Sequence, residues 1–174
     1  GEANLIYTCA ADGTPPATVS FSANGYNAAK ETAVTFASAG TYNFTVTISD
    51  GTLSTTSSVS VVVAQTLSSI TVAPSSAIVL QGASKAFTAT ALDQFGDVFS
   101  SAPTFAWSVN GSGSVTSAGV YTAPTGATPV DTVTASAGSV SGSASVTVLA
   151  ASQGFAFNGD GDIGSIYGVN GGTL

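Results

Sequence analysis

The sequence predicts an all-β fold, and three observations lead to that prediction. Valine, threonine, serine, glycine and alanine dominate the 174 residues, and strong helix formers are few. Apolar and polar residues alternate over Tyr42–Ser49, which is the period-two pattern of a strand with one buried and one wet face. Gly40 and the pair Asp50-Gly51 place turn residues at the two ends of this stretch.

Residues 1–64 carry five stretches of strand-like alternation, separated by a loop at Ala11–Pro16 and a turn at Asn24-Gly25. The side chains expected to face the core are Leu5, Tyr7 and Cys9, then Val19 and Phe21, then Val34 and Phe36, then Tyr42, Phe44, Val46 and Ile48, and last Val59, Val61 and Val63. A Gly-x-Tyr start to a late strand, as at Gly40-Thr41-Tyr42, is where immunoglobulin-like sandwiches place a tyrosine whose hydroxyl pins a corner.

A second unit is expected over residues 65–150, after a short linker around Ala64-Gln65-Thr66. Its strands are predicted at 69–72, 78–80, 87–92, 105–109, 115, 120–121, 132–135 and 145–148. Trp107 faces inward on the central strand of this pattern, so we expect it in the core. The segment 151–174 follows as an extended tail, too apolar for a pure linker and too short to fold alone.

The run Leu5–Cys9, followed by Ala39–Gly51, resembles the PKD and cadherin-like modules of secreted bacterial proteins. In those modules a Tyr-x-Trp pair opens the core and a Gly-Thr-Tyr strand closes it, and Cys9 stands where the family usually has Trp. The resemblance implies a further strand before the one that carries Tyr7. Since a complete sandwich has about seven strands, we expect residues 1–64 to lack this opening strand.

Residues 65–150 resemble bacterial Ig-like domains of the group 2 type. The stretches that match are Ser69–Val72, Phe87–Ala91, Ala106–Ser108 and Ser117–Tyr121. Together the two resemblances imply two tandem immunoglobulin-like β-sandwiches, the first lacking its opening strand, plus the extended C-terminal tail.

Composition excludes several classes of function. The chain has a net charge of −7, a pI of about 4.1, two lysines (Lys30 and Lys85) and no arginine or histidine. Nucleic acid and anionic membranes are therefore unsuitable partners, because no cationic patch is available to meet phosphate. The longest apolar run, Val61–Ala64, is strand-sized, so membrane insertion is not expected. The low charge and the Ser/Thr-rich surface favour an extracellular or cell-surface, secreted protein.

Catalysis is not expected either. A serine nucleophile usually needs a histidine base, which this chain lacks, and both lysines lie in Ala/Ser-rich surface contexts. Asp93 and Asp97 flank a tight turn and are interpreted as turn residues, with an acid–base pair as the alternative. Cys9 is interpreted as a small buried hydrophobe, with a reactive or metal-binding thiol as the alternative.

Several residues could bind or carry small groups. Asn158, Asp160 and Asp162 resemble part of an EF-hand calcium loop, although the main carboxylates of that loop are missing, and a solvated Gly/Asp turn is the alternative; no other cofactor is expected. Asn43 and Asn110 match the N-glycosylation pattern. Carbohydrate binding would need an exposed aromatic platform, and the loop aromatics available for it are Tyr26, Phe95 and Phe99.

Two features of the chain suggest a common explanation. The first sandwich is short of a strand, and the tail carries strand-like alternation at Phe155, Phe157, Ile163, Tyr167 and Val169. We therefore predict a non-catalytic, extracellular structural protein in which residues 154–174 complete the first sandwich of a neighbouring copy. Such head-to-tail contacts build a filament or a surface layer.

The alternative is a spacer or stalk from a larger secreted adhesin or polysaccharide-degrading enzyme, with weak carbohydrate binding. In that case the missing strand lies upstream, and the tail begins another module.

Overall fold

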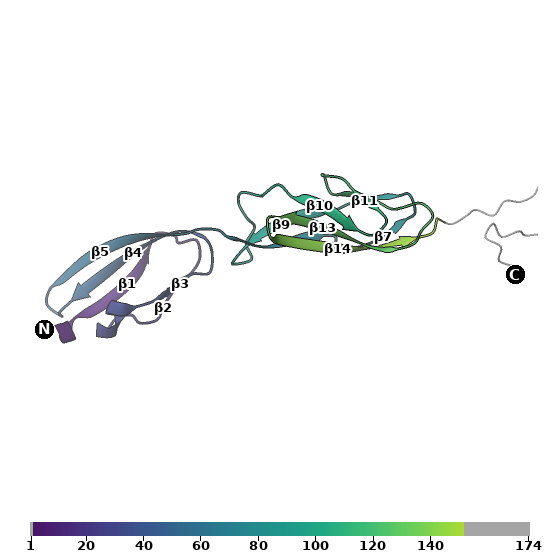
Figure 1. The fold of residues 1–174 in the computed structure, drawn as a ribbon. Helices are drawn as coiled ribbons and strands as arrows, with labels where there is room; N and C mark the ends of the chain where they lie inside the picture. The colour runs from purple at the N-terminus through teal and green to yellow at the C-terminus, as the bar shows by residue number, and fades with distance from the viewer. Residues whose placement is uncertain (1, 152–174) are drawn as a thin grey trace, which may run out of the picture. The chain divides into compact units, whose positions relative to one another are not determined.

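A computed structural model describes residues 2–151 and shows an all-β chain (Figure 1). The five strands predicted before residue 64 are confirmed. They are β1 (Ile6–Asp12), β2 (Ser20–Phe21), β3 (Val34–Thr35), β4 (Gly40–Ser49) and β5 (Ser54–Val63). Two short 3-10 turns, η1 (Glu2–Asn4) and η2 (Asn27–Glu31), accompany them and were not predicted.

The strands after residue 64 also follow the predicted pattern, with one addition. They are β6 (Leu67–Ala73), β7 (Ser76–Leu80), β8 (Ser84–Ala86), β9 (Thr88–Asp93), β10 (Ala106–Asn110), β11 (Ser114–Val115), β12 (Val120–Thr122), β13 (Val130–Ala137) and β14 (Val140–Leu149). The short strand β8 was not predicted, because three residues are too few for alternation to show in the sequence.

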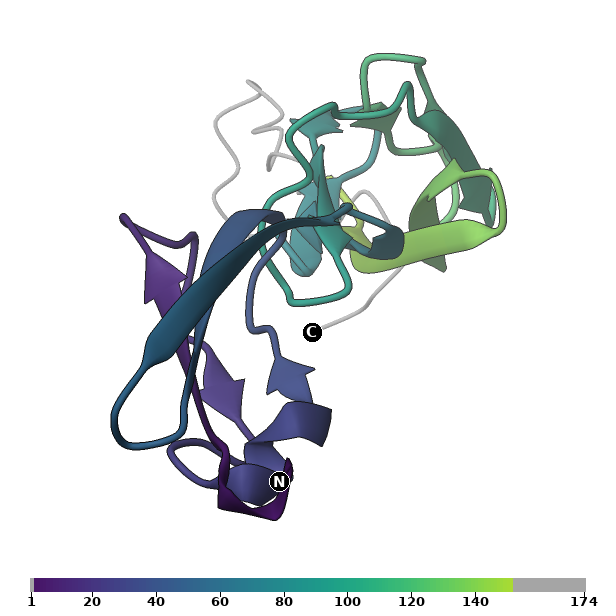
Figure 2. The ribbon, with the colours of Figure 1, turned by 90° about the vertical axis from the view of Figure 1, so that its left-hand side faces the viewer.

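The strands β1 to β5 form two layers. In the first layer β4 lies between β1 and β5, and both pairings are antiparallel (Figures 1 and 2). The β2–β3 pair faces this layer, and the ring of Phe21 packs edge-on against Phe44 with the centroids 5.9 Å apart. Phe36 packs on Tyr42 with a centroid distance of 4.7 Å. Aromatic rings thus join the two layers at one end.

The predicted tyrosine corner is confirmed. Tyr42 is fully buried, and its hydroxyl donates a hydrogen bond of 2.8 Å to the backbone oxygen of Ser38, which lies before β4 begins. The hydroxyl therefore holds the chain where it enters β4. Its ring contributes to the apolar core, so one side chain serves both packing and chain direction.

The strands after residue 64 form three further sheets. The largest has the order β10-β13-β14-β7, with β14 and β7 running parallel, and a second has the order β11-β12-β8; β6 pairs with β9. The buried apolar side chains contributed by these strands and their connections include Phe87, Tyr121, Val133, Ala135, Val146 and Val148. Trp107, which was expected in the core, is half-buried on β10, and its ring lies against Gly119.

The chain divides into two compact units. Within the described residues, unit 1 comprises residues 2–71, 90–104 and 137–141, and unit 2 comprises residues 72–89, 105–136 and 142–151. All of β1 to β5 belongs to unit 1. The domain boundaries expected from the sequence, after residues 64 and 150, remain a prediction.

Candidate functional site

An open apolar groove lies between the two layers formed by β1 to β5. Its volume is about 320 Å³. The residues that line it are Cys9 from β1, Phe44 and Val46 from β4, Val59 and Val61 from β5, and Phe21, Thr32, Val34 and Phe36 on and around β2 and β3. Thr32 is the one polar residue in this set. Its hydroxyl is already engaged, because it donates to the Ala23 oxygen and accepts from the Ala23 N–H.

Burial along β4 falls off where the groove opens. Tyr42 and Phe44 are 0% and 4% exposed, whereas Val46 and Ile48, on the same face of the same strand, are only half-buried. In a closed sandwich all four side chains would be covered, because alternate residues of a strand point to one face. The core of this region is therefore filled at one end and open at the other.

The side chain of Val59, which was expected to face the core, lies on the groove side of its strand but is not covered. Val59 pairs with Phe44 in the β4–β5 register and lines the groove, yet it is 54% exposed. Among residues 2–151 no strand pairs with the outer edge of β5, so nothing extends the layer beside Val59. Covering an apolar side chain that lies in a groove open to water is favourable, so this site would gain free energy from an added segment.

The two edges of the three-stranded layer differ. On the outer edge of β1, Asn24 Nδ2 donates to the Cys9 oxygen and the Cys9 N–H donates to Asn24 Oδ1, both at 2.8 Å. The Gly25 N–H donates to the Tyr7 oxygen, and Tyr26 forms a bridge with Tyr7. Side-chain and loop groups therefore occupy this edge as a neighbouring strand would.

The outer edge of β5 has no such cover within the described residues. The strand Ser54–Val63 consists of serine, threonine and valine, without a charged residue or a proline. Natural edge strands are usually protected by lysine, proline or a bulge. The β5 edge thus offers a row of backbone donors and acceptors directly beside the apolar groove.

Cys9 lies in the wall of this groove. It is 7% exposed and forms no disulfide. This placement agrees with its interpretation as a small buried hydrophobe. Among the described residues no group of three or more His, Cys, Asp or Glu side chains is arranged to hold a metal ion.

Asp93 stabilises the turn that follows β9. Its carboxylate accepts hydrogen bonds from the N–H groups of Phe95 and Asp97 and from Gln65 Nε2, at 2.9 to 3.0 Å. Burial raises the pKa of Asp93, but these hydrogen bonds outweigh burial and hold the pKa below its ordinary value. A carboxylate committed to three donors in this way acts as a turn constituent, which is the plainer of the two sequence interpretations.

A buried carboxylate at Asp131, which sequence reasoning missed, joins β12 to β13. Asp131 and Tyr121 are both fully buried, and the Tyr121 hydroxyl donates to Asp131 Oδ2 at 2.7 Å. The N–H of Gly113 donates to Oδ2 at 2.7 Å, and the N–H of Ser112 donates to Oδ1 at 3.1 Å. A Cβ atom at Gly111 would collide with this carboxylate, so glycine is needed there.

These hydrogen bonds determine the protonation of both groups. Burial raises the pKa of Asp131, but the bonds from Tyr121, Ser112 and Gly113 outweigh it, and the pKa is lowered overall. Burial, followed by the bond to Asp131, raises the pKa of the Tyr121 hydroxyl. The pair is therefore a carboxylate and a neutral phenol with their hydrogen bonds satisfied, which is a structural arrangement with no group free for catalysis.

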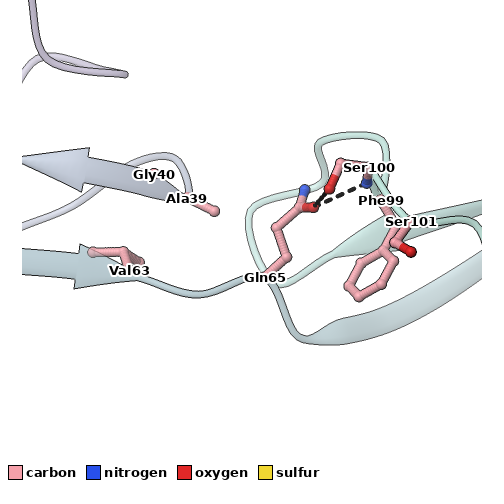
Figure 3. Close-up of a pocket in the computed structure, with 7 residues that line it drawn as sticks. All are labelled: Ala39, Gly40, Val63, Gln65, Phe99, Ser100 and Ser101. Atoms are coloured by element: carbon pink, nitrogen blue, oxygen red, sulfur yellow. Dashed lines mark hydrogen bonds between the residues drawn. The ribbon is translucent and has the colours of Figure 1, made fainter.

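A second hollow of unit 1 has a volume of about 410 Å³ and is lined by the seven residues labelled in Figure 3. Gln65 Oε1 accepts hydrogen bonds there from the N–H and the hydroxyl of Ser100, at 2.9 and 2.6 Å. None of the seven residues is titratable, so this hollow supports no acid–base chemistry. Of the three loop aromatics considered for carbohydrate, Phe95 and Phe99 are half-buried and Tyr26 is 52% exposed.

The remaining candidates are placed as follows. Asn43 is exposed on β4, and Asn110 is exposed at the end of β10, so both side chains are accessible. Lys30 forms an exposed ion pair with Glu2 at 2.8 Å, and Lys85 is exposed on β8. The calcium candidates Asn158, Asp160 and Asp162 and the strand candidates Phe155, Phe157, Ile163, Tyr167 and Val169 lie outside the described residues. Across residues 2–151 there is no helix long and apolar enough to cross a membrane.

Comparison with known proteins shows which folds this chain resembles. No family model matches the sequence, and no curated protein matches it. Among solved structures, Drosophila N-cadherin EC1-4 matches with a TM-score of 0.59 and 19% identity, over 85% of this chain and 41% of that one. The S-layer protein rSbsC matches with a TM-score of 0.46 and 21% identity, over 89% of this chain and 21% of that one.

Human protocadherin-24 EC1-2 also matches, with a TM-score of 0.40 and 13% identity, over 86% of this chain and 83% of that one. The chain thus spans less than half the length of the N-cadherin and rSbsC structures. At these identities the N-cadherin match is a likeness of fold. Together with the observed sheets, it shows that this chain has an immunoglobulin-like, cadherin-like β-sandwich fold.

Proposed function

We propose that this chain is a non-catalytic extracellular structural protein that assembles head-to-tail, into a filament or a surface layer, by strand complementation. In this proposal residues 1–64 and 65–150 are two tandem sandwiches, and residues 154–174 of one copy add a strand to the first sandwich of the next. The open apolar groove beside the uncovered β5 edge is the observation that carries the proposal.

The two features of the site complement each other physically. A strand paired with the outer edge of β5 would satisfy backbone groups of that edge. Because side chains alternate along a strand, every second residue of the added strand would point into the groove beside Val59 and Val61. The same segment would thus pair the backbone and fill the apolar space.

The electrostatics of the chain favour contacts of this kind. With charged residues at 6% of the sequence, long-range steering and salt bridges contribute little to association. A contact built from backbone hydrogen bonds and apolar side chains does not depend on charges. The groove and the β5 strand that borders it contain no charged residue.

The test compares four proteins by size-exclusion chromatography with light scattering and by electron microscopy, over a range of concentrations. The full chain should form head-to-tail oligomers, and the chain truncated after Ala151 should be monomeric. In the full chain, Val59→Lys should abolish assembly, because a charge at the groove would be buried by the incoming strand.

Val62→Lys is the matched control, because Val62 lies on the opposite face of the same strand and is 72% exposed. It should assemble like the unmodified chain. A full chain that stays monomeric, or a truncated chain that assembles as before, would contradict the proposal. A monomer would instead favour the spacer function, with an upstream segment of a longer protein covering the groove.

A further inference from the structure

We propose that two side chains, Phe155 and Phe157 of a second copy, fill the groove, with Ala156 between them facing away. This inference rests on the proposed function. It narrows the donor segment from residues 154–174 to residues 154–158, and it assigns the groove to a pair of phenyl rings.

The length of the groove sets the spacing of the side chains that enter it. On β4 the lining residues are Phe44 and Val46, and on β5 they are Val59 and Val61. Each pair is separated by one intervening residue, which corresponds to about 7 Å along a strand. Val59 lies opposite Phe44 in the β4–β5 register, so the two pairs are offset, and the groove borders β5 over one such step. An added strand running beside β5 would present two side chains to it, at positions i and i+2.

The volume of the groove sets the size of those side chains. An apolar cavity of about 150 Å³ holds one benzene ring. At about 320 Å³ the groove has room for two rings of this size. Smaller aliphatic side chains would leave part of the groove unfilled, and unfilled apolar space loses packing contacts.

The tail contains two pairs of apolar residues with this spacing, Phe155 with Phe157 and Tyr167 with Val169. The second pair would bring a phenol hydroxyl into the groove. Thr32, the one polar residue of the lining, is already hydrogen-bonded to Ala23 in both directions. A buried hydroxyl without a partner is unfavourable, so the groove selects the phenylalanine pair.

Charge along the tail favours the same segment. Residues 154–158 carry no charge, whereas Ile163, the remaining apolar candidate, directly follows Asp162 and lies three residues after Asp160. Pairing that stretch with the β5 edge would bring carboxylates next to an apolar groove and remove part of their hydration. The neutral segment containing the two phenylalanines avoids this cost.

The area involved indicates how tightly one contact can hold. Two phenylalanine side chains bury roughly 300–500 Å² together, whereas a stable interface buries about 1,200–2,000 Å² in total. The paired backbone and the groove walls have to supply the remainder. We therefore expect assembly to depend on protein concentration.

The first experiment uses the full chain and measures molar mass by light scattering at several concentrations. The double variant F155S/F157S should be monomeric where the unmodified chain is oligomeric. The triple variant I163S/Y167S/V169S is the matched control and should assemble normally. If the triple variant loses assembly and the double variant retains it, the inference is overturned while the proposed function stands. If the unmodified chain is monomeric, or if both variants and the truncated chain assemble, both fail.

The second experiment reads the groove directly through Cys9, the single cysteine of the chain. The chain truncated after Ala151 is treated with a thiol-reactive disulfide reagent, with and without a synthetic peptide of residues 152–160. Occupation of the groove should slow the reaction roughly tenfold or more, because thiol exchange requires access to the sulfur. The same peptide with both phenylalanines replaced by serine should give no protection. Equal rates with and without the native peptide would overturn the assignment.

Discussion

Replacing the buried carboxylate of Asp131 by an amide should strongly destabilise unit 2. Asp131→Asn keeps the shape of the side chain but turns one acceptor oxygen into a donor NH₂ group. In either orientation this group faces a backbone N–H, that of Gly113 beside Oδ2 or that of Ser112 beside Oδ1. One of these N–H groups is therefore left without its acceptor beside the fully buried Asp131 side chain.

The magnitude follows from the hydrogen bonds. An unsatisfied buried N–H costs about 1–3 kcal/mol, and each of the two remaining bonds loses about 1 kcal/mol when its acceptor is no longer charged. The expected loss in free energy of unfolding is therefore about 3–5 kcal/mol. The assay is urea denaturation followed by the fluorescence of Trp107, the single tryptophan of the chain, which lies in the same unit.

The control Lys85→Gln changes an exposed charge on β8, also in unit 2, and should stay within about 0.5 kcal/mol of the unmodified chain. The pH dependence gives an independent check. The pKa of Asp131 is lowered on folding. The contribution of its charge to the free energy of unfolding is therefore fully present above the ordinary aspartate pKa of about 3.9. It is lost as the pH falls through the folded-state pKa.

The stability difference between the unmodified chain and Asp131→Asn should therefore be constant between about pH 5 and pH 8 and should narrow below about pH 4. A loss of less than about 1 kcal/mol in free energy of unfolding at neutral pH would refute this hydrogen-bond argument, since one unsatisfied N–H alone should cost at least that much. A difference that stayed constant into strong acid would show that the charge of Asp131 is not responsible.

Two further predictions concern the layer formed by β1, β4 and β5. Tyr42→Phe removes the hydrogen bond to Ser38 and should lower the free energy of unfolding of this region by about 1 kcal/mol. Amide hydrogen exchange in β4 measures this loss. Unchanged exchange rates would contradict a stabilising role for the Tyr42 hydroxyl. Asn24→Ala removes both side-chain bonds to the Cys9 backbone, so the Cys9 amide should exchange faster while that of Phe44 keeps its rate. Equal acceleration at both amides would mean that Asn24 stabilises the whole layer and not only its edge.

Most of the local structure could be predicted because alternation is a local property. The stretch from Tyr42 to Ile48 reads as a strand from its own residues, and β4 covers it. The corner hydrogen bond of Tyr42 could also be anticipated, because it reaches back only four residues, to Ser38. Cys9 was expected to be buried from its position on the apolar face of its strand, and it is.

The Asp131 site could not be predicted, because its donors come from segments 10 to 19 residues away. An aspartate next to a strand ordinarily reads as a solvated residue. Two nearby glycines, Gly111 and Gly113, were the signal available, since a side chain at either position would collide with Asp131 or Tyr121. Glycines in a loop have many other causes, however, and nothing local links them to a carboxylate on β13, which follows only after β11 and β12.

By itself the sequence determined that this chain is all-β, where most of its strands lie and which side chains share a face. It could do so because the alternation of a strand is visible in consecutive residues. Only the tertiary structure decided which of those faces are covered. Tyr42 and Val59 both belong to apolar faces, yet one is fully buried and the other is more than half exposed. Burial depends on what lies opposite a strand, and that is set by segments distant in sequence, which no local pattern encodes.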